Sequence, residues 1–159
     1  MDMPWWSWVL IGATAVAVVA FAVLRNPLAA RRQSSRLERA RKEFRLQRER
    51  LELEFFNRAA RSGKPRGLRW KNCDFDSDVL FARYKKSRKL TAFVGVTVSF
   101  EAIEGGDMEE VEAVGTLRAA TAVFHYASQG WATHGRVVFN LEPAEAVAYY
   151  ENELEAVGP

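Results

Sequence analysis

An uncharged apolar run near the start of the sequence constrains this chain more than any other feature. It covers residues 5–24, WWSWVLIGATAVAVVAFAVL, and its 20 residues match the length that a helix needs to cross a bilayer core of about 30 Å. Aromatic side chains stand at its start and a basic side chain follows its end, as in helices whose ends lie at the membrane–water interface. These flanking residues are Trp5, Trp6, Trp8 and Arg25. We therefore expect residues 1–25 to form a transmembrane anchor.

A secretory signal peptide is the main alternative interpretation of this run. Such a peptide starts with a basic segment, has a shorter apolar core and ends at a cleavage site of small residues. Here residues 1–4 precede the run, and they contain Asp2 but no Lys or Arg. The flanking residues therefore favour a span that stays in the protein.

Basic residues determine the expected orientation of the span. None precedes it, whereas seven Lys and Arg residues lie between Arg25 and Lys42. The positive-inside rule then places the N-terminus outside and everything after Arg25 in the cytoplasm. Cys73 is the single cysteine and has no partner for an internal disulfide, which agrees with a reducing compartment. We predict a single-pass membrane protein with a cytoplasmic C-terminal domain.

A long helix is expected over residues 26–62. Asn26 and Pro27 suit an N-cap and a first helical position, and no further Gly or Pro occurs before Gly63. Its first half is polar and basic, whereas apolar residues recur at helical spacing from Phe44 onward. We expect this second half to pack on the following domain. The stripe consists of Phe44, Leu51, Phe55 and Ala59, widened by Leu53, Phe56 and Ala60.

The basic first half has more than one possible role. It determines topology, and its arginines are candidates for contact with anionic lipid. The predicted lipid contacts are Arg31, Arg32, Arg36 and Arg39. Interleaved glutamates and the lack of a recognisable binding module disfavour nucleic acid. Oligomerisation stays open, because Leu37, Phe44 and Leu51 are seven residues apart, although the positions between them suit a coiled coil poorly.

Residues 63–159 are predicted to form an α+β domain. Residues 25–66 contain 14 Lys and Arg against 5 Asp and Glu, a net charge of +9. Residues 67–159 contain 9 against 14, a net charge of −5. From Leu68 the apolar period changes from 3.6 to 2, which predicts strands at 68–75, 79–85 and 90–104. The third has one apolar face that runs from Ala92 to Ala102.

Two glycine-containing turns predict hairpins. A two-residue turn at Gly105-Gly106 pairs Val98 with Ala113 and Val96 with Gly115. A turn at Gln129-Gly130 pairs Phe124 with Gly135, Ala122 with Val137 and Ala120 with Phe139. The two registers use opposite faces of the strand they share, so we expect a bulge or bend at 118–121 and a strongly curved sheet. A short helix at 108–114 is the alternative for the first turn.

The chain is expected to end with a helix from Pro143 to about Val157. The predicted fold is therefore a curved antiparallel sheet of about five strands, with the C-terminal helix on the same face as the long helix. This architecture resembles cystatin-like and NTF2-like sheets that wrap around a helix. The resemblance concerns architecture alone, since no family motif is present, and such folds have many functions.

The sequence offers no catalytic or cofactor-binding set. SGKPRG, residues 62–67, lacks the upstream Gly of a phosphate-binding loop and contains Pro65, so we interpret it as a boundary between helix and strand. His125 and His134 face each other in the second hairpin but lack a third metal ligand. We predict neither a metal site nor a cofactor.

The leading hypothesis is a non-catalytic, membrane-tethered module that binds an unknown protein partner. One alternative is a small-molecule binder or enzyme with a pocket between sheet and helix; the other is lipid or nucleic-acid contact through the basic helix. The partner surfaces expected are an acidic loop and two tryptophans. These residues are Glu104, Asp107, Glu109, Glu110, Trp70 and Trp131.

Overall fold

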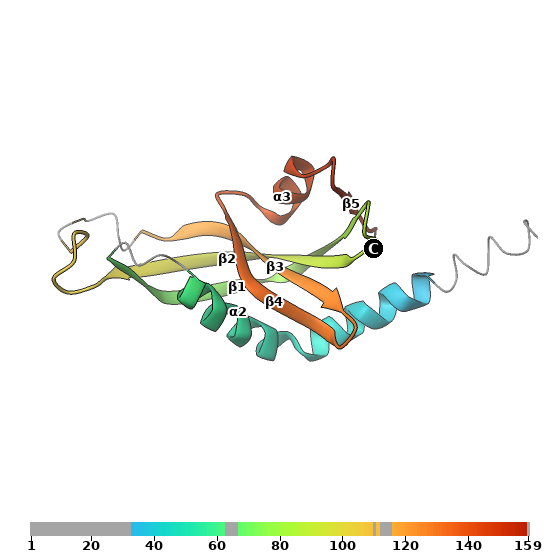
Figure 1. Cartoon of the computed structure of the whole chain (residues 1–159), viewed down its shortest axis with the longest axis horizontal. Helices are drawn as coiled ribbons and strands as arrows, with labels where there is room; N and C mark the ends of the chain where they lie inside the picture. Colours follow the sequence, from blue (N-terminus) through green and yellow to red (C-terminus); the bar gives the residue numbers. More distant parts are fainter. Residues whose placement is uncertain (1–32, 63–66, 110, 112–115, 159) are drawn as a thin grey trace, which may run out of the picture. The chain divides into compact units, whose positions relative to one another are not determined.

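The computed structural model describes residues 33–62, 67–109, 111 and 116–158 (Figure 1). The chain divides into two compact units, Met1–Lys42 and Glu43–Pro159. The predicted span at 5–24 lies outside the described residues, as do Trp5, Trp6, Trp8, Arg25, Arg31 and Arg32. No helix in the described part of the chain is long and apolar enough to cross a membrane. Of the predicted lipid contacts, Arg36 and Arg39 are described, and both side chains are exposed on a helix.

Helical residues 43–46 and the helix that follows them fill the core of the second unit. Residues 33–46 are helical, Gln47 forms a turn, and helix α2 covers Arg48–Ser62. The hydrogen-bond ladder is interrupted here: Gln47 N–H donates to the carbonyls of Glu43 at 3.0 Å and Phe44 at 3.2 Å, and the regular pattern resumes where Leu51 N–H donates to the Gln47 carbonyl at 3.0 Å. The predicted inner stripe is confirmed, because Phe44, Leu51, Phe55 and Ala59 are all buried.

The widening of that stripe was predicted wrongly at two positions. Leu53 is 64 % exposed and Ala60 is exposed as well. Successive residues are rotated by about 100° around a helix, so Leu53 points about 200° away from Leu51. Phe56, which lies between these directions, is half-buried.

The sheet is antiparallel and has five strands, as predicted. They are β1 (Leu68–Tyr84), β2 (Leu90–Ala102), β3 (Arg118–Ala127), β4 (Gly130–Phe139) and β5 (Leu154–Ala156), in the spatial order β4-β3-β2-β1-β5. The strands assigned to 68–75 and 79–85 form one strand, interrupted by a register shift between Phe75 and Val79. Arg48 holds this irregularity against α2 by donating to the carbonyls of Asp76 and Ser77, the latter at 2.7 Å.

The first predicted hairpin is wrong. In the structure Val98 pairs with Arg118 and Val96 with Ala120, so β2 and β3 are joined by residues 103–117. Most of the alternative helix at 108–114 lies outside the described residues. With the observed register, β3 directs its even-numbered residues to the same side along its whole length. The bend predicted at 118–121 is therefore not needed.

The register predicted for the second hairpin is right far from the turn and wrong close to it. Ala122 pairs with Val137 and Ala120 with Phe139, as predicted, but Phe124 pairs with Thr133. The extra residues lie around Gly135, whose φ is +73°. A Cβ at Gly135 would lie 2.5 Å from the backbone nitrogen of Ala59. A glycine is thus required where β4 bulges against the backbone of α2.

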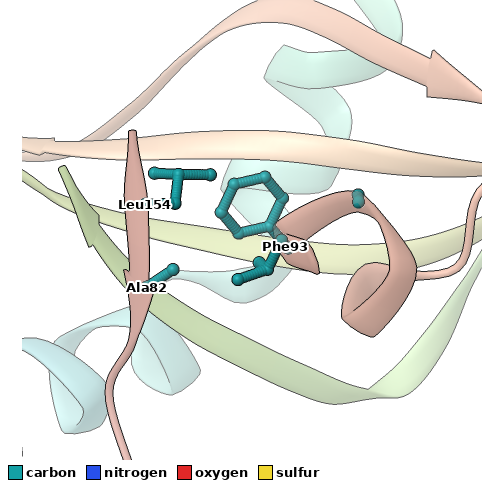
Figure 2. Close-up of a cluster of buried hydrophobic side chains, with 5 residues drawn as sticks. Ala82, Phe93 and Leu154 are labelled. Atoms are coloured by element: carbon teal, nitrogen blue, oxygen red, sulfur yellow. The ribbon is translucent and has the colours of Figure 1, made fainter. Parts of the chain in front are cut away.

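Helices cover both faces of the sheet (Figure 1). On the α2 face, the Phe44 ring lies 5.4 Å from Phe124 and 4.9 Å from Trp131 between ring centroids. Helix α3 (Pro143–Tyr149) packs on the other face. There Ala146 and Val147 of α3 cluster with Ala82, Phe93 and Leu154 (Figure 2).

The prediction that both helices share one face is therefore wrong. Phe93 and Val94 are consecutive on β2 and point to opposite faces, and both are buried. The predicted helix 143–157 also ends early, at Tyr149, and the chain then adds β5 alongside Ala82–Tyr84 of β1.

Two leucines on α2 provide a matched test of the packing. We expect Leu51→Ala to lower the free energy of unfolding by about 2–5 kcal/mol, because it leaves a cavity in a fully buried site. Leu53→Ala removes the same atoms from the exposed side and should change it by less than about 0.5 kcal/mol. Urea unfolding of the full-length chain measures both. Equal losses would contradict the assignment of the buried face.

Two glycines with φ of +73° test the contact between α2 and β4. Gly105→Ala adds a Cβ in open space, so it should cost about 1 kcal/mol for its backbone conformation alone. Gly135→Ala also forces backbone atoms of α2 and β4 apart, and should cost about 3 kcal/mol in total. Thermal unfolding of the two variants compares them directly. A Gly135→Ala variant as stable as Gly105→Ala would show that the helix does not lie this close.

Candidate functional site

The predicted acidic surface is a solvated loop. Glu104, Asp107 and Glu109 are exposed in the turns that follow β2, and Glu110 lies outside the described residues. Glu109 accepts a hydrogen bond from the backbone N–H of Gly105 at 2.8 Å, so this carboxylate stabilises the loop itself. Among the residues that the structure describes, no group of three His, Cys, Asp or Glu side chains could hold a metal ion.

The two tryptophans proposed as partner contacts have different environments. Trp131 is 3 % exposed, and its ring contacts Phe44, Phe81 and Tyr126, so it belongs to the core and has no surface to offer a partner. Trp70 is half-buried, 5.3 Å from the Phe100 ring. It is part of a distal aromatic cluster at the end of α2. The cluster consists of Phe56, Trp70, Phe100 and Phe139.

The two histidines stack on each other as neighbours on adjacent strands. Their ring centroids are 4.3 Å apart and their planes differ by 21°. They were predicted to pair directly, but His125 lies opposite Ala132, because the bulge in β4 shifts His134. Burial, followed by the positive charges of His134, Lys89 and Arg58, lowers the pKa of His125, while Glu54 acts in the opposite direction.

Sequence reasoning missed an open groove between α2 and β4. It has a volume of about 720 Å³ and contains three arginines but only one carboxylate. Its lining residues are Arg50, Leu53, Glu54, Asn57, Arg58, Arg61 and His134. Six of these residues come from α2, and His134 comes from the bulged part of β4.

Arg50 and Arg58 are held in place along this groove. Arg50 donates to the Gln47 amide oxygen at 2.6 Å and to the backbone carbonyl of Trp131 at 3.4 Å, which connects α2 to β4. Both arginines pair with Glu54, at 3.4 Å and 2.9 Å. Their side chains remain 57 % and 52 % exposed, so each keeps donors available to a ligand.

Two leucines are exposed on either side of the turn at Gln47. Leu46, just before α2, is 77 % exposed, and Leu53, which lines the groove on α2, is 64 % exposed. The sequence signal for the exposure of Leu53 was its position between Leu51 and Phe55, since three such positions cannot share one narrow helix face.

The interior between the buried stripe and the sheet is filled. Phe44, just before α2, and Leu51 and Phe55 of α2 pack there, and each is at most 1 % exposed. The cleft between α3 and the sheet, lined by Phe93, Arg136 and Tyr150 among others, has a volume of about 20 Å³. That is room for about one water molecule.

Cys73 and Asp76 of β1 have a thiol and a carboxylate in distinct surroundings. Burial, followed by the charges of Asp74 and Glu52, raises the pKa of Cys73 to about 12, so its thiol stays protonated at neutral pH. The Asp76 carboxylate occupies the place that a Cβ on residue 95 would take, so only glycine fits there. Asp76 also lines an open hollow of about 560 Å³.

Comparison of the chain with known protein families, with curated proteins and with solved structures finds no match. The features of this chain that bear on function are the groove, the exposed leucines and the sequence of the N-terminal segment.

The histidine stack predicts a pH-dependent stability. Because the pKa of His125 is lower in the folded protein than its ordinary value of 6.5, the unfolded chain binds the proton more readily. The stability is complete above about pH 6.5 and falls as the pH drops through the folded-state pKa. His125→Gln should reduce the decrease in urea midpoint between pH 7.5 and pH 5.0.

His134→Gln is the matched control for this experiment. It removes one positive charge that lowers the pKa of His125 but leaves burial, the larger cause, in place. It should therefore reduce the pH dependence by less than His125→Gln does. If His125→Gln loses as much stability on acidification as the unmodified chain, the histidine stack is not the source.

Proposed function

We propose that this chain is a single-pass membrane protein whose cytoplasmic α+β domain binds a protein partner without catalysing a reaction. The apolar run at 5–24 and the arginines that follow it support the anchor and its orientation. In this proposal Trp5, Trp6, Trp8 and Arg25 hold the span at its two ends. The basic segment contacts anionic lipid through Arg31, Arg32, Arg36 and Arg39.

The observation that carries the binding role is the exposure of Leu46, just before α2, and of Leu53, which lies among the arginines of the groove. Exposed apolar side chains bordered by charged ones are a feature of interaction surfaces. The buried stripe of Phe44, Leu51 and Phe55 already packs on the sheet. The exposed leucines are therefore not needed to fold the domain.

The alternatives have less support from the geometry. A small-molecule site enclosed between sheet and helix would require space that aromatic rings occupy on the α2 side; on the α3 side one cleft leaves about 20 Å³, and the larger hollow of about 560 Å³ beside Asp76 is open to solvent. The arginines of the groove could bind the phosphates of a nucleic acid. The apolar side chain of Leu53 and the negative charge of Glu54 in the same groove disfavour that ligand. The distal aromatic cluster and the acidic loop remain further candidate surfaces for a protein partner.

Membrane attachment is tested by fractionation of cells that produce the full-length chain. We expect it to stay with the membrane after alkaline carbonate extraction, since an integral span resists this treatment. A variant with Gln at Arg31, Arg32, Arg36 and Arg39 should remain integral. Protease added to intact cells should leave residues 43–159 uncut, and digestion of that part would reverse the proposed orientation.

Partner binding is tested by photo-crosslinking in cells, with the crosslinker placed at one exposed position at a time. A crosslinker at Leu53 samples the surface of α2, and one at Tyr149 samples the surface of α3. Crosslinkers at Glu104 and Leu117 sample the ends of β2 and β3. We expect a discrete crosslinked protein from at least one of these surfaces. A chain that forms no specific crosslink at any position would exclude the proposed binding function.

A further inference from the structure

We infer that the turn between β1 and β2 is a second membrane contact, which docks the folded domain on the anionic lipid of the cytoplasmic leaflet. This inference rests on the proposed function, because it requires the anchor and its orientation. The turn covers residues 85–89, KKSRK, and we call it the basic turn. It contains four basic residues and no acidic one, and all five of its residues are exposed.

Hydrogen bonds hold the basic turn in a fixed shape. Tyr84 N–H donates to the Lys89 carbonyl at 3.0 Å, and Arg88 N–H donates to the Tyr84 carbonyl at 2.8 Å. The Lys85 ammonium donates to the backbone carbonyl of Glu151 at 2.6 Å, which ties the turn to the segment before β5. The backbone that carries the basic side chains is therefore already ordered, and this lowers the entropy cost of binding.

Lys86 and Lys89 supply the charge that is available to lipid. Three glutamates within residues 151–155 lie beside the turn and balance part of its charge, and one of them, Glu155, pairs with Arg88 at 2.5 Å. Within the described residues no ion pair involves Lys86 or Lys89. Each basic residue near an anionic leaflet raises the affinity about fivefold, so these two lysines suffice for a reversible contact of a tethered domain.

The basic turn lies at the end of the domain where the chain arrives from the predicted span. Glu43 is the first residue of the second unit, and its carboxylate accepts a hydrogen bond from the Tyr126 hydroxyl at 3.0 Å. Tyr126 follows the β3 residue that pairs with Thr91, and Thr91 is two residues from the basic turn. The point of attachment and the basic turn are therefore at the same end of the sheet.

This attachment favours lipid over other anionic partners. The predicted span ends at residue 24, and the 18 residues from 25 to 42 reach at most about 60 Å when fully extended. The basic turn therefore stays near the leaflet, and tethering of this kind gives an effective concentration in the millimolar range. The leaflet has a negative surface potential that attracts basic residues within about 10 Å. A soluble anion must compete with this permanent neighbour.

The charge at the other end of the sheet argues against a second copy of this chain as the occupant. Described residues 103–109, which follow β2, include three exposed acidic residues and no basic one. The 13 residues of β2 separate this acidic loop from the basic turn by about 40 Å along the strand (Figure 1). In an anchored neighbour the acidic loop is equally far from its own attachment, which places it poorly for contact with the basic turn. An anionic leaflet meets the basic turn while the acidic loop points away.

The test measures lysine labelling in the full-length chain, with a single copy inserted in each nanodisc. Phosphatidylcholine, which has no net charge, is compared with a mixture of phosphatidylcholine and anionic phosphatidylserine. A neutral acylating reagent and mass spectrometry give the labelling rate of each lysine. We expect Lys86 and Lys89 to react at least threefold more slowly on the anionic lipid, and added salt to abolish the difference.

Lys71 is the internal control for this measurement. It is exposed on β1 next to Trp70, which pairs with Phe100 at the end of the sheet far from the basic turn. Its labelling rate should be the same on both lipids.

Charge-reversal variants assign the effect to the basic turn. Lys86→Glu should restore most of the labelling of Lys89, and Lys89→Glu most of that of Lys86, because each reversal lowers the affinity for the leaflet about fivefold or more. Lys71→Glu is the matched control at an exposed position outside the turn, and it should change neither rate. The variant with Gln at the four arginines of the basic segment should keep most of the protection.

The outcomes separate this inference from the proposed function. Equal labelling on the two lipids, or protection that survives both charge reversals, would overturn the inference. Slow labelling of both lysines on either lipid would show that a protein surface covers the turn, and loss of protection in the four-glutamine variant would assign the contact to the basic segment; both results overturn it as well. Each leaves the anchor and the partner-binding function standing. A chain that does not enter the nanodisc rejects the anchor, and the inference with it.

Discussion

The close approach of α2 to β4 at Gly135 is the contact on which the rest of the domain depends. There the two backbones come so near that a methyl group would lie 2.5 Å from the nitrogen of Ala59. Such proximity lets Phe44 and Phe55 reach the rings of Phe124 and Trp131 and fill the concave side of the sheet. It also forms the groove, since the same bulge brings His134 beside the arginines of α2. The bulge of β4 thus affects both the packing of α2 in the core and the lining of the groove at the surface.

The fold was predictable where a pattern is local. The stripe from Phe44 to Ala59 follows from helical periodicity, and the far half of the second hairpin follows from alternation of apolar residues. The first hairpin was mistaken because Gly105-Gly106 satisfies the rules for a two-residue turn. The register of β3 is determined instead by which of its residues face α2. Ala120 and Ala122 take these positions when residues 103–117 form a longer connection between β2 and β3. A turn motif alone contains no information about that distant contact.

The faces of the sheet and the groove were harder to predict. The run AFVGV, residues 92–96, has no polar position, which is typical of a strand covered on both faces, but it was interpreted as alternating. Leu53 was assigned to the core because its neighbours are apolar, whereas its direction on the helix exposes it. The groove depends on the bulge of β4 and on Arg50 reaching the Trp131 carbonyl, neither of which has a signal in local sequence.

Helix α2 buries one face and exposes the other, and in the proposed function this links occupancy to stability. Its inner residues pack on the sheet, while Leu53 on its outer side lies outside the core. A ligand that binds only the folded helix shifts the unfolding equilibrium by mass action, by about 2.7 kcal/mol at a hundredfold excess over its dissociation constant. The domain's melting temperature therefore becomes a measure of how much of the protein is engaged. Under the proposed function, a chain without a bound partner would unfold, and be degraded, more readily than a chain in the complex.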